Sequence, residues 1–358
     1  MNTTKTFSIK NIDRKNLFMK ITIISGGSGN DALVKGLKAF YKDKNLSIKV
    51  IVNAYDNGKS TGVCRKVTDT LGVSDIRKNH SRMYVSEYGD KVDKNLLEFY
   101  EKRFDFTKNK EELEISKLLD KWNLKEYKKY VSNFFKNPKA NEFNYKDFSV
   151  SNIVYSQMYK ELGYEKTNKH FCDKMGIDDF VVLNSFDNIF IKALKESGTI
   201  IDDEGKTVFW NNKNDRIIST IYEGKIKYGL NPKAIELIDN SDLIIISTGT
   251  FWSSIQPTIE YMNFYDYINK AKCQKIWIIN NEDDGDSFGV TNLDFIHYME
   301  RTGLDLSNVK ILLNKSAKET LKLTIPNYNF IVKDMGNIKG KHEPEKMVKS
   351  VIDTYYDK

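Results

Sequence analysis

The sequence predicts an α/β protein with a mostly parallel sheet. Short apolar runs rich in β-branched residues are typical of buried strands, and the clearest span residues 21–24, 48–54, 242–247 and 275–279. A small polar loop follows each run, and apolar residues at helical spacing follow the loop. Because parallel strands connect through right-handed crossovers, the four loops should share one edge of the sheet.

Length and composition limit the class of protein. The 358 residues suit one large α/β domain, which we place at residues 19–358, and 40% hydrophobic residues suffice for a substantial core. Residues 1–18 are polar and lack the apolar centre of a signal peptide, so we expect a flexible leader there. No apolar run approaches the ~20 residues of a membrane span, so we expect no membrane partner.

Charge and cysteine usage narrow the class further. The net charge is +7, but the lysines are spread along the chain, so we expect no nucleic-acid partner. Cys64, Cys172 and Cys273 are far apart and show no CxxC spacing. That pattern argues against a disulfide framework or a zinc site and favours a reducing, cytoplasmic compartment.

Local patterns predict the remaining elements. Between residues 90 and 146, amphipathic helices dense in Lys and Glu predict a helical insertion that covers one side of the sheet. Ser197-Gly198 between two apolar runs predicts a hairpin over residues 189–201, and Asn231-Pro232 predicts a helix start. We expect further helices at 63–70, 152–162 (capped by Ser151), 294–300 and 343–356, strands at 180–183, 217–222, 309–313 and 330–333, and a small loop at 72–77.

The loop after the first strand consists almost entirely of small residues. It comprises Ser25, Gly26, Gly27, Ser28, Gly29 and Asn30. Glycines let the main chain approach an anion closely, and the helix that follows directs free backbone N–H groups toward it. The pattern lacks both the GxGxxG spacing and the P-loop lysine. Taken alone, it fits a tight βα turn as well as a phosphate-binding site.

Three later loops add polar groups at the same predicted edge. We expect them to bind a nucleotide diphosphate or a similar ligand through backbone N–H groups, hydroxyls and amides. The candidate residues are Lys59, Ser60 and Thr61 after the second strand and Thr248, Gly249, Thr250 and Ser253 after residues 242–247. Asn57 after the second strand and Asn280 after residues 275–279 are candidate substrate-binding residues at the same edge.

The acidic residues suggest a divalent cation. Mg²⁺ prefers one or two carboxylates together with phosphate oxygens. Asp56 is the first candidate metal ligand and catalytic residue, and Asp75, two residues before Arg77, is the second. Either aspartate could instead cap a loop or a helix, and Lys59 could be a solvated loop lysine instead of a phosphate partner.

These motifs resemble, in order, those of the family of 2-phospho-L-lactate transferases (CofD-like) and gluconeogenesis factors (YvcK-like). The family's GGGTG loop is matched by SGGSG at 25–29, its DDGGSSG by DNGKSTG at 56–62, and its GD(I/L)R by SDIR at 74–77. Its Gly-Asn helix start is matched by Ser151-Asn152, and its GPGSLYTSIIPNL by STGTFWSSIQPT at 247–258. The resemblance extends from about residue 19 to the C-terminus.

The resemblance implies a Rossmann-like, three-layer fold and a homodimer. One branch of the family transfers a phospholactyl group from a nucleotide-diphosphate donor with Mg²⁺, and there Asp56 would bind the metal or orient the acceptor. Asp75, Arg77 and Asn152 would contact the substrate. The other branch binds UDP-sugars or similar nucleotides and regulates central metabolism and cell-wall synthesis.

The sequence therefore leaves two hypotheses. The first is a transferase that moves a phosphoryl-linked group from an activated nucleotide donor to a small acceptor. The second is a regulator that binds a nucleotide sugar without turnover. Asn57 stands where the family has a second acidic residue, which favours the second hypothesis, while the retained Asp56 favours the first.

Overall fold

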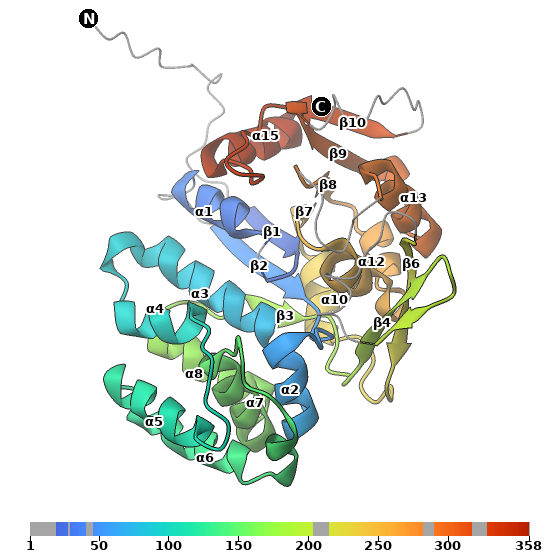
Figure 1. Ribbon diagram of the computed structural model, residues 1–358. Coiled ribbons are helices and arrows are strands. Elements are labelled where there is room, and N and C mark those ends of the chain that lie inside the picture. The colour runs from blue at the N-terminus through green and yellow to red at the C-terminus, as the bar shows by residue number, and fades with distance from the viewer. Residues whose placement is uncertain are drawn as a thin grey trace, which may run out of the picture.

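A parallel sheet of seven strands lies at the centre of the protein (Figure 1). The computed structural model describes residues 19–27, 29–40, 46–202, 215–281, 290–316 and 328–357, so the predicted leader at 1–18 lies outside the described residues. The strand order is β10-β9-β8-β7-β1-β2-β3. The strands are β1 (Met19–Ile24), β2 (Leu46–Val52), β3 (Val181–Leu183), β7 (Leu243–Ile246), β8 (Gln274–Ile278), β9 (Val309–Asn314) and β10 (Asn329–Lys333).

Helices cover both faces of the sheet, which explains why its strands are almost wholly apolar. Alternate residues face opposite sides: Ile21 and Ile23 pack on one face, Ile244 and Ile246 on the other. The first face is covered by α1 (Asp31–Phe40), α3 (Ser74–Tyr88) and α15 (Pro344–Tyr356). The second is covered by α10 (Pro232–Asp239), α11 (Gln256–Glu260), α12 (Tyr265–Lys270) and α13 (Asn292–Thr302). The predicted three-layer, Rossmann-like α/β fold is confirmed.

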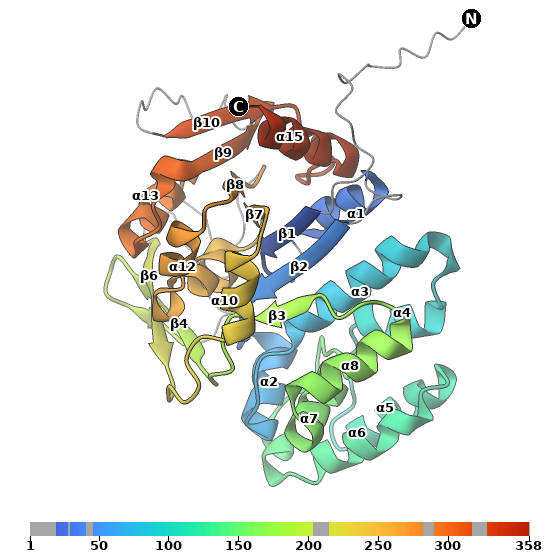
Figure 2. The same ribbon diagram turned by 180° about the vertical axis from the view of Figure 1, so that it is seen from behind.

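The helical region between β2 and β3 is longer than the insertion predicted at 90–146. It comprises α2 (Lys59–Thr68), α3, α4 (Lys94–Glu101), α5 (Glu111–Lys121), α6 (Lys128–Phe135), α7 (Val150–Leu162) and α8 (Tyr164–Met175). Figures 1 and 2 show α4–α8 gathered beside β3, beyond the edge of the sheet. The sequence did not reveal α8, whose stretch YEKTNKHFCDKM contains few apolar residues. Buried residues of this region share the core of the first sheet face.

Three helix starts differ from the prediction because polar residues enter the first turn. The first is α2, which begins at Lys59 instead of Val63, so Ser60 and Thr61 are helical. The second is α3, which begins at Ser74, so Asp75 and Arg77 lie on a helix and not in the loop predicted at 72–77. An acidic residue in the first turn stabilises a helix through the macrodipole, which accounts for Asp75. The third is α7, which begins at Val150 instead of Asn152, so its N-cap residue is Ser149, two residues before the predicted Ser151.

A second, antiparallel sheet has the order β5-β4-β6. The predicted hairpin is confirmed as β4 (Phe190–Lys195) and β5 (Ile200–Ile201), and β6 (Ile217–Glu223) pairs with β4. The three cysteines are free thiols, as expected. Within the described part of the chain, no helix combines the length and apolar character needed to cross a bilayer.

Burial of His80 on α3 predicts a loss of stability in mild acid. Its Nδ1 lies 2.9 Å from the Tyr155 hydroxyl, and burial lowers the pKa of His80 to about 3. Between that value and its ordinary pKa of about 6.5, the unfolded state binds a proton that the native state does not, so stability falls as the pH falls. We expect His80 to contribute up to about 1.4 kcal/mol of lost stability per pH unit below about pH 6.

Urea unfolding of the wild type and of His80→Asn at pH 4–7 tests this expectation. The amide can still face the Tyr155 hydroxyl but cannot titrate. The difference in unfolding free energy between the two proteins should therefore shrink as the pH falls. A difference that stays constant over this range would contradict the prediction.

Candidate functional site

The candidate site lies at the carboxyl ends of the central strands. Strand β1 lies between β2 and β7. Strands β2 and β3 follow on one side of it, and β7, β8, β9 and β10 follow on the other, so the strand order reverses at β1. Such a reversal of strand order opens a crevice at the carboxyl edge of a parallel sheet, where α/β proteins bind ligands. The loops after β1, β2, β7 and β8 all start there, as predicted.

The loops after β1 and β7 are in direct contact. The Thr248 hydroxyl donates to the carbonyl oxygen of Gly29. A Cβ atom on Gly29 would lie 1.8 Å from the Thr248 carbonyl oxygen, so only glycine permits this approach. A Cβ on Gly249 would lie 3.7 Å from the backbone nitrogen of Gly26. Ser28 lies outside the described residues, so the prediction for its side chain remains a prediction.

Asn280 ties the loops after β7 and β8 together. Its Oδ1 accepts from the Gly249 backbone nitrogen at 3.1 Å, and its Nδ2 donates to the Gly249 carbonyl oxygen at 3.0 Å. This two-way contact fixes Gly249 beside the glycine loop. Residues 282–289, which follow in the same loop, lie outside the described residues.

A chain of hydroxyls leads from the loop after β7 to Asp75. Ser253 Oγ donates to Thr250 Oγ1 at 2.8 Å, Thr250 Oγ1 lies 3.0 Å from Ser254 Oγ, and Ser254 Oγ donates to Asp75 Oδ2 at 3.4 Å. Residues 251–255 form a π-helical turn, a rare geometry that is frequent at functional sites. The other carboxylate oxygen, Asp75 Oδ1, lies 2.5 Å from where a Cβ on Gly27 would stand. Asp75 is therefore packed between two of the four loops.

The electrostatics single out Asp75. Burial raises its pKa, and the negative charge of Asp56 adds to that rise. The ammonium group of Lys78, 3.7 Å from Asp75 Oδ1, acts in the opposite direction. A buried carboxylate near a second carboxylate gains from a cation, so the environment of Asp75 suits a bound metal ion.

Asp56 lies in a tight turn whose backbone is anchored by Arg65. Asp56 Oδ1 accepts from the Gly58 backbone nitrogen at 2.9 Å, and its side chain is half-buried. Arg65, only 1% exposed, donates to the carbonyl oxygens of Tyr55 and Asp56 at 2.8 and 3.1 Å and to that of Ile189 at 2.7 Å. The position of the Asp56 turn therefore depends on a buried guanidinium group.

The neighbours of Asp56 point elsewhere. Asn57 Nδ2 donates to the carbonyl oxygens of Ile191 and Asp202, at 3.2 and 3.4 Å, on the β4–β5 hairpin. Lys59 forms a half-exposed ion pair with Asp147 at 3.1 Å. Because Asn57 is directed toward the hairpin, the amide that stands there in place of an acid does not change the side chains of Asp56 and Asp75.

A buried network supports the start of α2 from behind. Arg77 Nε donates to Asn152 Oδ1 at 2.8 Å, and Asn152 Nδ2 donates to Ser60 Oγ at 3.0 Å and to Thr61 Oγ1 at 3.3 Å. These four residues, at most 4% exposed, bind one another, and burial lowers the pKa of Arg77. The structure thus joins four of the predicted contact residues into a support for the site.

Asn53 is a site residue that the sequence analysis missed. Its Nδ2 lies 3.2 and 3.0 Å from the carbonyl oxygens of Ser253 and Ser254, and its Oδ1 accepts from the Tyr55 backbone nitrogen at 3.0 Å. Asn53 therefore links the Asp56 turn to the π-helical turn. The available signal was an amide at the end of an otherwise apolar strand, IKVIVNA.

The arrangement suits an anion with a cation. Helices α1, α2 and α3 begin at this edge, so the positive ends of their dipoles meet the loops. In the described residues, no group of three or more His, Cys, Asp or Glu side chains is placed to hold a metal ion. Two carboxylates completed by phosphate oxygens are a set that Mg²⁺ accepts.

Comparisons with known proteins agree with the motifs. The family model described as "2-phospho-L-lactate transferase CofD" matches residues 21–335. A "Gluconeogenesis factor" of Listeria innocua is 21% identical and covers 94% of this chain and 87% of its own. Another from Halalkalibacterium halodurans is 22% identical and covers 84% and 80%.

A solved structure supports the fold. It is a protein of the UPF0052 family from Bacillus halodurans, with a TM-score of 0.70 and 19% identity over 93% of this chain and 99% of its own. At that identity the likeness concerns the fold alone. The family model, in contrast, covers most of the chain. The chain therefore belongs to the CofD family, and the resemblance of its motifs to CofD-like and YvcK-like proteins is confirmed.

Proposed function

We propose that the chain binds the diphosphate of a nucleotide-linked small molecule with Mg²⁺ at the carboxyl edge and transfers a phosphorus-linked group to a small acceptor. The observation that carries the proposal is the buried Asp75, packed between Gly27 and Ser254 and facing the charge of Asp56. A buried carboxylate beside a second negative charge is costly, and Lys78, 3.7 Å from Asp75, offsets only part of that cost because the pKa of Asp75 is still raised. Such carboxylates cluster at functional sites.

The chain's own groups divide the work. Backbone N–H groups of the glycine loop and of the helix starts would hold phosphate oxygens. Asp56 and Asp75 would hold Mg²⁺, which offsets phosphate charge when bound. Asp56, which is half-buried, would also orient the acceptor hydroxyl. Positioning of donor and acceptor in line is the main contribution that such a transfer requires.

A regulator without turnover is the second candidate. The curated relatives bear the name gluconeogenesis factor. The resemblance to the YvcK-like branch implies that such a protein binds a UDP-sugar or a similar nucleotide. Both candidates use the same edge of the sheet. Thermal unfolding with UDP, GDP and UDP-sugars, with and without Mg²⁺, separates them when combined with product analysis. Metal-dependent product formation supports the transferase; stabilisation without product supports the regulator.

The variant Asp75→Asn tests the site itself. We expect it to weaken the Mg²⁺-dependent binding of a nucleoside diphosphate about tenfold or more, since a charge-assisted contact is lost. Because burial raises the pKa of Asp75, a negative charge at this position costs stability in the folded protein, so the unliganded variant should unfold at the same or a higher temperature.

Asp93→Asn is the matched control. Asp93 caps α4, where its Oδ1 accepts from Asn95 and Leu96 at 2.8 and 3.3 Å, and asparagine caps helices equally well. This control should bind the nucleotide like the wild type. Wild-type Mg²⁺ dependence in Asp75→Asn would refute the assignment of Asp75.

A further inference from the structure

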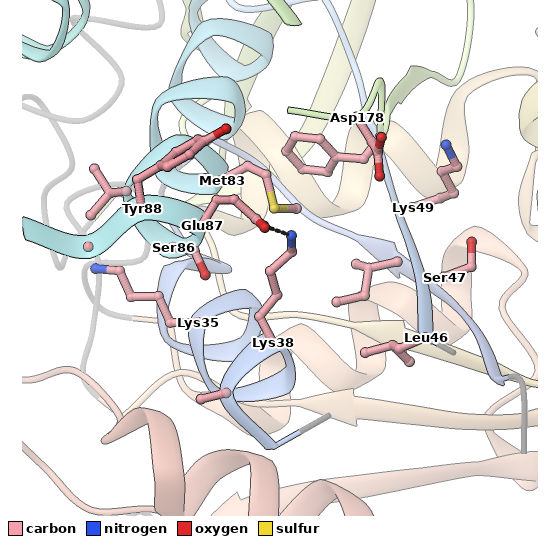
Figure 3. Close-up of a pocket in the computed structure, with 15 residues that line it drawn as sticks. Lys35, Lys38, Leu46, Ser47, Lys49, Met83, Ser86, Glu87, Tyr88 and Asp178 are labelled. Atoms are coloured by element: carbon pink, nitrogen blue, oxygen red, sulfur yellow. Dashed lines mark hydrogen bonds and ion pairs between the residues drawn. The ribbon is translucent and has the colours of Figure 1, made fainter. Parts of the chain in front are cut away.

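A second hollow lies at the opposite, amino-terminal edge of the sheet. It has a volume of about 980 Å³ and lies between the second half of α1, the last turn of α3 and the start of β2 (Figure 3). Its walls include Lys38, Leu46, Lys49, Met83, Glu87 and Phe180. We call it the α1–α3 cleft. Its size falls within the range of ligand-binding pockets, and none of the four loops of the candidate site reaches it.

The walls of the α1–α3 cleft combine apolar and charged groups. Leu46 and Met83 face the same space, and Phe180 also lines it (Figure 3). On one side, the ammonium group of Lys38 on α1 reaches across to the carboxylate of Glu87 on α3. Apolar walls with a few convergent polar groups are the usual composition of a small-molecule site.

Lys49 supplies a positive charge on the other side. Its ammonium group donates to the carbonyl oxygen of Asp179 at 2.5 Å, and Asp178 also lines this part of the cleft. Lys35 is paired at 3.0 Å with Asp31, but both side chains are more than one third exposed, so that pair is weak and exchangeable. The cleft thus offers cationic groups that a bound acid could pair with.

We propose that the α1–α3 cleft binds a small metabolite that joins an apolar body to an acidic group, a carboxylate or a phosphate. The apolar body lies against Leu46, Met83 and Phe180. The acidic group faces the ammonium group of Lys49. This site is distinct from the candidate site at the carboxyl edge.

The two helices that wall the cleft also lead to the candidate site. The first turn of α1 follows Gly29 and Asn30, and the first turn of α3 carries Asp75. Asn30 Nδ2 donates to Asn79 Oδ1 at 2.7 Å, and Arg82 donates to the carbonyl oxygen of Gly27, so α3 holds the glycine loop as well. A ligand that draws α1 and α3 together at the cleft would alter the spacing of Gly27 and Asp75. This coupling rests on the proposed function, whereas binding in the cleft does not.

Three naphthalene probes test the cleft directly: 1-naphthoate, 1-naphthyl phosphate and the neutral 1-naphthol. Fluorescence titration of the full chain should show one binding site, with at least one of the anions about fivefold or more tighter than 1-naphthol. Which anion binds more tightly identifies the acidic group. Equal affinity for 1-naphthol and both anions, or no binding of any probe, would overturn the proposal.

Variants locate the binding. Lys49→Met should remove the advantage of the anions over 1-naphthol, and Ser86→Trp, which adds bulk to a cleft-lining position, should abolish binding of all three. Lys333→Met is the control, because Lys333 lies on β10 at the far end of the sheet and pairs with Asp357. Near-ultraviolet circular dichroism checks that each variant is folded. If Lys49→Met does not fold, Ser86→Trp alone tests whether the probes bind in the cleft. Unchanged binding in Ser86→Trp would place the probe elsewhere and overturn the proposal.

Coupling is measured separately. Saturating 1-naphthoate should change the affinity for UDP with Mg²⁺ about fivefold or more, in the range typical of allosteric sites. Ser86→Trp should lose this change. If UDP does not bind at all, the proposed function is at fault while the cleft result stands; if UDP binds but 1-naphthoate leaves its affinity unchanged, the coupling is refuted.

Discussion

Arg65→Met is expected to destabilise the protein by about 3–5 kcal/mol, because several buried oxygens lose their donor and each such loss costs about 1–3 kcal/mol. The guanidinium group is 1% exposed, and its N–H groups donate to oxygens that include the backbone carbonyls of Tyr55, Asp56 and Ile189. Methionine fills most of the volume but leaves these buried oxygens without their donor. Urea unfolding at pH 7 measures the loss.

The same change should abolish metal-dependent nucleotide binding, because the Asp56 turn loses its anchor. Arg65→Lys should rescue little, since a single ammonium group cannot reproduce the fork of donors. Arg216→Met is the matched control: Arg216 pairs with Glu196 at 2.6 Å at the surface, and its loss should barely move the unfolding midpoint. If the unfolding free energy of Arg65→Met lies within about 1 kcal/mol of the wild-type value, Arg65 does not anchor the Asp56 turn.

Gly29→Ala is expected to separate the loops after β1 and β7. The new Cβ would lie 1.8 Å from the Thr248 carbonyl oxygen and 2.7 Å from the Gly249 Cα, so one loop must move by more than 1 Å. Overpacking of this kind costs about 1–3 kcal/mol. A displacement of 1 Å can weaken a positioned site about a hundredfold, so nucleotide binding should fall by a similar factor.

Gly249→Ala in the adjoining loop is the comparison for stability. Its Cβ would meet the flexible end of Ile255 at 3.3 Å, which can yield. We therefore expect Gly249→Ala to unfold near the wild-type midpoint and Gly29→Ala clearly below it. Equal midpoints for the two variants would show that the close approach at Gly29 carries no strain, contrary to the contact described above.

The sheet could be predicted from the sequence because most of its strands are short, continuous apolar runs. Runs such as DLIIIS are apolar at successive positions, and this pattern is typical of a parallel strand that helices cover on both faces. The convergence of the four loops then followed from topology alone. Helix α8 was not predicted, because its buried stripe holds only a few apolar side chains, Phe171, Cys172 and Met175, within a stretch that is otherwise polar.

The roles of individual side chains were harder to predict than the location of the site. The loops that carry Asp56 and Asp75 made both residues candidate metal ligands, but no pattern in the sequence shows that two residues 19 positions apart lie near each other. Arg77 and Asn152 were expected to contact substrate, yet the structure has them supporting Ser60 and Thr61. Direction of a side chain depends on tertiary contacts that spacing does not encode.

The position of β1 between β2 and β7 has a consequence for synthesis of the chain on the ribosome. Ile21 pairs with Leu243, so the middle of the sheet is completed only after more than 200 further residues have been made. Until then, β1 presents a bare apolar edge that could pair with another nascent chain. Truncated forms that end before β7 should therefore aggregate, and the full protein should fold slowly for its size.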